Sequence, residues 1–121
     1  MANPTEKQVA DLLRARGVPA HVNEGGATGL LTRWHTFVLQ AEAGYGFGLD
    51  DYRNDLDLRS LIALTGLDAA AAEDDARFRV LLTQPHLEVW SSDAPHAWWT
   101  RGYPVNSGPD LLADLRAASI L

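Results

Sequence analysis

The chain has 121 residues, of which 46% are hydrophobic and 21% are charged, as in an ordinary single globular domain. It has no cysteine, which excludes disulfides, thiolate metal sites and cysteine nucleophiles and fits a reducing cytoplasm. The first residues carry no signal-peptide pattern, and no apolar run approaches the roughly 18 residues that would span a membrane. We therefore expect a cytoplasmic protein, and its nine arginines beside a single lysine suggest a GC-rich bacterial genome.

The net charge of −6 is concentrated in residues 50–75, which hold eight acidic residues against two arginines, while acids and bases cancel elsewhere. The chain has no cluster of lysine and arginine of the kind that binds phosphate backbones, so we expect no nucleic-acid partner. An acidic face usually serves only solubility. It can also steer a basic partner, and for that role we select Asp50 and Asp51.

The first third of the chain predicts one helix followed by three strands. A capping box at Thr5 opens a helix over residues 5–16, which Gly17 ends. Residues 20–24 and 33–43 are predicted strands, the second because of its β-branched and aromatic residues. In residues 44–48 glycines occupy one face, which invites a packed helix or a ligand there.

The rest of the chain predicts two short helices, two strands and a final helix. Asp57 caps a helix that ends at Gly66, and Asp68 caps a second one. The pair superficially resembles a helix-turn-helix, but the acidic second helix has the wrong sign for DNA. The remaining elements are strands at 78–83 and 87–92, joined by a turn at 84–86, and a helix that opens after Ser107.

This order predicts one α+β domain over residues 1–121, with an antiparallel sheet of about five strands and flanking N-terminal, central and C-terminal helices. It is similar to the order in small acidic secretion chaperones, where a helix, three strands, a helix, two strands and a helix form a dimer. The additional helix at residues 68–77 departs from that order.

No motif for catalysis or metal binding is present. The four histidines lack the helical spacing of a zinc pair, and a GxSxG nucleophile motif is absent. The aspartates of residues 50–57 invite a calcium loop, but the required positions hold Arg53, Leu56 and Ile62. We therefore expect no cofactor and no metal.

The densest aromatic cluster is APHAWWTRGYP, residues 94–104. Pro95 favours a short helical turn, on which adjacent tryptophans can share one broad face. Trp34 and Trp90 lie in predicted strands and are expected in the core, so at least one of Trp98 and Trp99 should be partly exposed. Three interpretations remain open for this stretch: core packing, a partner-binding surface, or a small-ligand pocket.

The leading hypothesis is a protein-binding domain without catalytic activity, such as an adaptor, an immunity-type inhibitor or a secretion chaperone. Its partner would be another protein, possibly a basic one, or a second copy, with no membrane contact. An alternative is a small enzyme or small-molecule binder with a pocket beside residues 44–50 that uses His35, Asp50 or His96. A further alternative is a self-associating structural subunit of a phage or secretion assembly. The predicted binding residues are Trp98, Trp99, Arg101, Tyr103, His96, Asp50 and Asp51.

Overall fold

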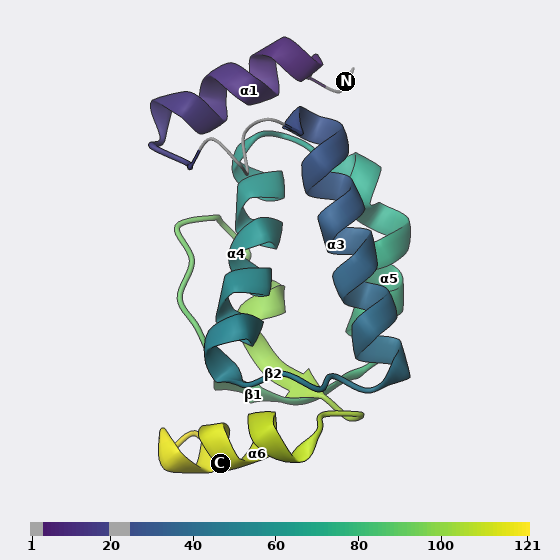
Figure 1. Cartoon of the computed structure of the whole chain (residues 1–121), viewed down its shortest axis with the longest axis vertical. Helices are drawn as coiled ribbons and strands as arrows, with labels where there is room; N and C mark the ends of the chain where they lie inside the picture. The colour runs from purple at the N-terminus through teal and green to yellow at the C-terminus, as the bar shows by residue number, and fades with distance from the viewer. Residues whose placement is uncertain (1–3, 20–24) are drawn as a thin grey trace.

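The computed structural model describes residues 4–19 and 25–121, which form five α-helices and one sheet of two antiparallel strands. Helix α3 packs against α4 and α5, α1 lies across one end of this group, and the strands with α6 close the other end (Figure 1). The α-helices are α1 (Glu6–Ala15), α3 (Gly26–Ala43), α4 (Leu49–Leu64), α5 (Ala72–Arg79) and α6 (Pro109–Ala117). Mixed α and β content is confirmed, but the predicted sheet of about five strands is wrong, because 60% of the described residues are helical and the sheet that they form has only two strands. The similarity in element order to secretion chaperones is lost with those strands.

The predicted strand at residues 33–43 is instead the second half of α3. Threonine, valine and aromatic residues favour a strand locally, but that preference is worth only about 1 kcal/mol and depends on context. The buried positions of α3 follow the spacing of three and four residues that defines one helical face. That face packs against α4 and α5, and its largest buried members are Leu30, Trp34, Phe37 and Val38.

Helix α4 begins at Leu49, well before the predicted start at Asp57. Its first turn receives no cap from the residue before it. The carboxylate of Asp114, in α6, accepts a hydrogen bond from the Leu49 amide at 3.0 Å instead. Because this cap comes from a helix distant in sequence, the local pattern does not predict it, and residues 50–56 were not predicted to be helical.

The predicted helix ends that depend on neighbouring residues are confirmed. The hydroxyl of Thr5 accepts from the Gln8 amide, and the Gln8 side chain accepts from the Thr5 amide, which completes the capping box of α1. Gly17 and Gly66 adopt φ values of +74° and +80° after α1 and α4. The amide after each glycine donates to a carbonyl inside the helix, the arrangement that commonly ends helices at glycine.

The predicted strands at 78–83 and 87–92 are displaced. Strand β1 (Leu82–Glu88) runs through the predicted turn and pairs antiparallel with β2 (Arg101–Pro104), with an irregular register in its middle. Phe78 and Arg79, the first residues of the predicted strand at 78–83, end α5 instead, and the Phe78 ring packs against Trp34 and Phe37 of α3. The predicted strand at residues 20–24 lies outside the described residues.

The helices predicted after Asp68 and Ser107 exist, but neither residue caps them as expected. Asp68 begins a 3₁₀ turn (Asp68–Ala71) that leads into α5, and its carboxylate binds Arg59. The hydroxyl of Ser107 donates to a carbonyl of β2, and α6 begins at Pro109, a residue suited to a first helical turn.

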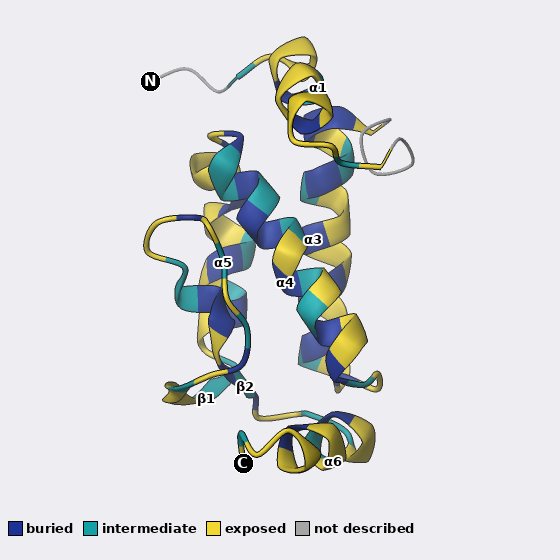
Figure 2. Cartoon of the chain, turned by 90° about the vertical axis from the view of Figure 1, so that its left-hand side faces the viewer, coloured by how far each residue is buried: buried dark blue, intermediate teal, exposed yellow. Residues whose placement is uncertain are grey.

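The core lies between the three central helices and the strands, where the buried positions face inward (Figure 2). Its centre is a group of five aromatic rings with centroids 5.1–6.0 Å apart. Offset and edge-to-face contacts of this kind add about 0.5–1.5 kcal/mol per pair to the area that they bury. The rings belong to Trp34, Phe37, Tyr45, Tyr52 and Phe78.

Candidate functional site

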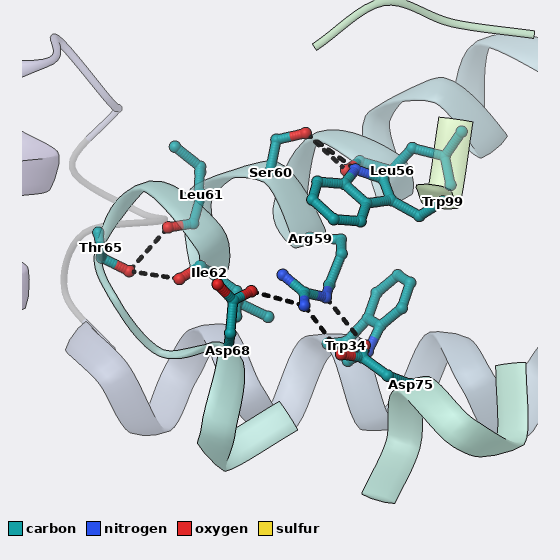
Figure 3. A network of polar contacts seen from close by, with 10 residues as sticks. All are labelled: Trp34, Leu56, Arg59, Ser60, Leu61, Ile62, Thr65, Asp68, Asp75 and Trp99. Carbon is teal, nitrogen blue, oxygen red and sulfur yellow. Dashed lines mark hydrogen bonds and ion pairs between the residues drawn. The ribbon is translucent and has the colours of Figure 1, made fainter. Parts of the chain in front are cut away.

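Trp99, one of the predicted binding residues, is buried with 2% of its surface exposed. It lies in a 3₁₀ turn (Trp98–Thr100), so a short helical turn is present as predicted, but it begins at Trp98 and does not include Pro95. Its indole N–H donates to the Ser60 hydroxyl at 3.0 Å, and the Arg59 guanidinium lies 4.5 Å from the ring centroid (Figure 3). Trp99 is therefore a core residue in this conformation and presents no surface to a partner.

Trp98 is partly exposed, and its ring is held on the surface by neighbouring side chains. The guanidinium of Arg79 lies 4.1 Å from the ring centroid, and the rings of Phe78 and Trp99 pack at 6.1 and 5.7 Å. Arg79, at the end of α5, thus stacks on the Trp98 ring. Because the two residues lie far apart in the sequence, this contact could not be predicted from it. The arginine covers part of the surface that Trp98 could offer.

The other predicted residues of this stretch lie at the surface. Arg101 is exposed and approaches Glu88 across the strands at 3.7 Å. The Tyr103 hydroxyl, on a partly exposed side chain, accepts from the Gln84 side-chain amide at 3.3 Å. His96 is exposed in the connection between the strands.

Part of the acidic segment is internal structure. Asp75 is buried and accepts from Arg59 Nε and Nη2 at 2.8 Å each and from the Trp34 indole at 3.0 Å (Figure 3). Asp68 binds the same Arg59 from the surface at 2.7 Å. Burial alone would lower the pKa of Arg59, but the hydrogen bonds and charges of Asp75 and Asp68 hold that pKa above its ordinary value. This network ties α3, α4 and α5 together.

A groove of about 800 Å³ lies along α4, between the end of α1 and the chain segment 91–93. We call it the α4 groove. The segment that follows β1 passes beside α4 in Figure 1 and forms one wall. The apolar floor of the groove is a row of partly exposed leucines on α4, Leu58, Leu61 and Leu64.

The α4 groove carries more acidic than basic side chains. Its carboxylates are Asp55, Asp57 and Asp93, and its only cation among the described residues is Arg16. None of the three carboxylates forms an ion pair within residues 4–19 and 25–121. The groove therefore has carboxylates without an ion-pair partner among the described residues, beside an apolar floor.

Two of the three groove carboxylates accept hydrogen bonds from aromatic side chains. Asp55 accepts from the Tyr45 hydroxyl at 2.8 Å, and Asp57 accepts from the Trp90 indole at 2.7 Å. Burial raises the pKa of Asp55, the Tyr45 hydrogen bond opposes that rise, and the nearby Asp51 charge adds to it. Burial and the Asp55 charge raise the pKa of Tyr45, so that its hydroxyl stays protonated and donates.

The sequence did not predict the groove, and the two acidic residues selected from it lie outside the groove. Asp50 and Asp51 are exposed in the first turn of α4 and do not line the groove. Their carboxylates lie where a helix N-terminus favours negative charge. Leu58, Leu61 and Leu64 were predicted to share one helix, but with its start predicted at Asp57, residues 54–56 were not placed on that helix beside them.

The α4 groove does not include the polar groups that were predicted for a pocket beside residues 44–50. His35 binds Asp74 at 2.8 Å between α3 and α5, and neither His35, Asp50 nor His96 lines the α4 groove. Of the three glycines, only Gly48 lies against α6, where a Cβ would be 2.6 Å from the Asp114 carboxylate, and a Cβ at Gly46 would meet nothing within 4 Å. The packed helix, one of the two neighbours considered for that face, is therefore found at Gly48 alone.

The residues that the structure describes contain no group of three or more histidine and acidic side chains placed to hold a metal ion. Within the same residues, no helix combines the length and the apolar character needed to cross a bilayer.

Comparisons with models of known protein families, with curated proteins and with solved structures found no match to this chain.

Proposed function

We propose that this chain is a protein-binding domain that holds a segment of a partner protein in the α4 groove. The observation that carries the proposal is the combination of an exposed apolar floor with unpaired carboxylates in one concave surface. Interfaces characteristically join an apolar centre to a polar rim. Here the leucine row is the apolar centre, and Asp57 and Asp93 form the polar rim.

The groove is a better candidate than the aromatic stretch. Interface energy concentrates in side chains that a partner can bury completely. Trp99 is already buried by its own chain, and Arg79 covers part of Trp98. The leucines of the groove floor keep apolar surface that only an occupant would remove from water, at about 25 cal/mol for each Å².

The proposal is a non-catalytic role, and an adaptor, an immunity-type inhibitor or a secretion chaperone would each use such a groove. A cytoplasmic location belongs to the proposal and is supported by the absence of cysteine. A second candidate is a small-molecule binder, which is favoured by one observation. The groove volume of about 800 Å³ falls within the roughly 300–1,000 Å³ of ligand pockets.

The test is a pull-down from native cell lysate with a variant that blocks the groove by size alone. Asn54 is exposed on the groove wall, so Asn54→Trp fills the space without changing charge. Thr36→Trp makes the same change at an exposed position of α3 outside the groove. Circular dichroism must first show that both variants are folded, and mass spectrometry then identifies bound proteins.

We expect one protein to bind to the wild type and to Thr36→Trp and to be absent with Asn54→Trp. A partner that is retained by Asn54→Trp would contradict the groove as the binding surface. If no protein binds specifically while a metabolite co-purifies with the wild type and not with Asn54→Trp, the small-molecule function replaces the proposal. Self-association detected by light scattering and lost with Asn54→Trp would make the partner a second copy of the chain.

A further inference from the structure

We infer that the occupant of the α4 groove is a basic amphipathic helix, with its apolar face on the leucine row and its lysines or arginines against the acidic rim. This inference rests on the proposed function and adds the chemistry and the secondary structure of the partner.

The floor of the groove fits a helix in length and in surface relief. Leu58, Leu61 and Leu64 are spaced by three residues along α4, so they form one of the side-chain ridges that pack into the grooves of another helix. The groove follows α4 from Asn54 to Leu64, a length of about 15 Å. A helix of about ten residues covers that distance.

An extended segment fits the groove less well. Binding of an extended chain usually adds a strand to a free sheet edge, which satisfies its backbone N–H and C=O groups. The floor here is the side-chain face of a helix, and residues 91–93 of the wall are in no strand. A helical occupant satisfies its own backbone and needs only side-chain contacts.

The rim selects the charge of the occupant. Three carboxylates against Arg16 leave a balance of −2 around the groove, and the whole net charge of the chain lies in the segment that includes α4. Asp93 has no partner among the described residues, and Asp57 uses one oxygen for the Trp90 indole. A lysine or arginine on the occupant would meet unpaired carboxylates, whereas an acidic side chain would meet like charge.

The test uses two synthetic peptides of about 14 residues, or four helical turns, with the same leucine face and either lysine or glutamate on the polar face. Each carries a fluorophore and is titrated with the full chain, and anisotropy reports binding. The variant Asp57→Asn/Asp93→Asn removes two rim charges and keeps an oxygen for the Trp90 indole. The control Glu73→Gln/Asp110→Asn removes two exposed charges that lie outside the groove.

We expect the lysine peptide to bind and the glutamate peptide not to bind. Loss of two exposed charge pairs should weaken the lysine peptide by about three- to tenfold, with no change in the control. Added salt should weaken binding of the wild type more than that of Asp57→Asn/Asp93→Asn. Asn54→Trp should abolish binding.

The inference is overturned if the lysine peptide fails to bind, if the glutamate peptide binds equally well, or if the Asp57→Asn/Asp93→Asn and control variants behave alike. Binding that survives in Asn54→Trp overturns it as well, because the peptide would then adhere outside the groove. The failure of this inference can be distinguished from the failure of the proposed function. If the lysate partner is lost with Asn54→Trp while the lysine peptide binds no better than the glutamate peptide, the proposed function stands and the groove holds a segment of other chemistry.

Discussion

Substitution of Asp75 by alanine removes the carboxylate that accepts three hydrogen bonds in the core. Two come from Arg59 and one from the Trp34 indole. In the variant, the buried Arg59 guanidinium keeps one described anionic partner, Asp68, whose side chain is 61% exposed. The substitution therefore leaves a cation inside the protein with a weaker counter-charge, and an indole N–H with no acceptor.

The size of the effect follows from these two losses. Breaking a buried ion pair by removing one partner costs about 3–5 kcal/mol. Asp68 still neutralises part of the Arg59 charge, which places the loss near the lower end, and the unsatisfied Trp34 N–H adds about 1 kcal/mol or more. We expect the free energy of unfolding to fall by about 4 kcal/mol, from a total that is typically about 5–15 kcal/mol.

Urea unfolding followed by far-ultraviolet circular dichroism measures this loss, and Asp68→Ala is the matched control. Asp68 binds the same guanidinium at a similar distance, but exposed pairs contribute only about 0–1 kcal/mol. Equal losses for Asp75→Ala and Asp68→Ala, with unchanged denaturant slopes, would refute the reasoning, since burial would then not decide the strength of the pair.

Three further predictions concern backbone, charge and packing. Gly102→Ala should destabilise the protein by about 2–5 kcal/mol, because the φ of Gly102 is +78° and an added Cβ would lie 2.4 Å from a backbone oxygen. The control is Gly17→Ala, whose Cβ would meet nothing within 4 Å and which should cost about 1 kcal/mol. Urea unfolding measures both losses. Glu6 caps the start of α3, and the hydrogen bond from the Thr28 hydroxyl, with smaller contributions from the Ala27 and Thr28 amides, holds the pKa of Glu6 below its ordinary value although desolvation opposes it. This stabilisation is present above the ordinary pKa and is lost as pH falls through the lowered pKa. The protection factors of the α1 amides, which correct exchange rates for their intrinsic pH dependence, should therefore fall in acid, and they should fall less in Glu6→Gln. Trp98→Ala should remain folded with a loss of about 1–2 kcal/mol, while Trp99→Ala should lose about 3–5 kcal/mol; equal losses would contradict the burial assigned to the two rings.

Features set by neighbouring residues were predictable from the sequence. The capping box at Thr5 and the glycine ends at Gly17 and Gly66 need only contacts within one or two helical turns, and all three are confirmed. A short helical turn was likewise predicted from the neighbouring Pro95, although the turn begins at Trp98. These elements do not depend on what the rest of the chain does.

Features set by distant residues were not predictable. The start of α4 depends on Asp114, and the start of α3 is capped by Glu6 of α1. In α3, packing on two helices outweighs the local preference of residues 33–43 for a strand. The sheet was overpredicted because each of these long-range contacts was missing from the local pattern.

The candidate site was only partly accessible from the sequence. Composition located the negative charge in residues 50–75, but it could not show which of these carboxylates are buried in the core and which lie at the surface. Asp75 is buried with Arg59, whereas Asp57 lies on the rim of the groove. The residue type is the same in both places, and only the helical phase of α4 and α5 against their neighbours separates a structural carboxylate from one that is open to a partner.

The most direct test of the proposed function is amide hydrogen exchange of the wild-type chain, alone and bound to the protein that it captures. Exchange in the groove should slow on binding, at residues 54–64 of α4 and in segment 91–93. Residues 98–104 should change little. Slowed exchange confined to residues 98–104, with α4 unaffected, would contradict the account and return the binding surface to the aromatic stretch.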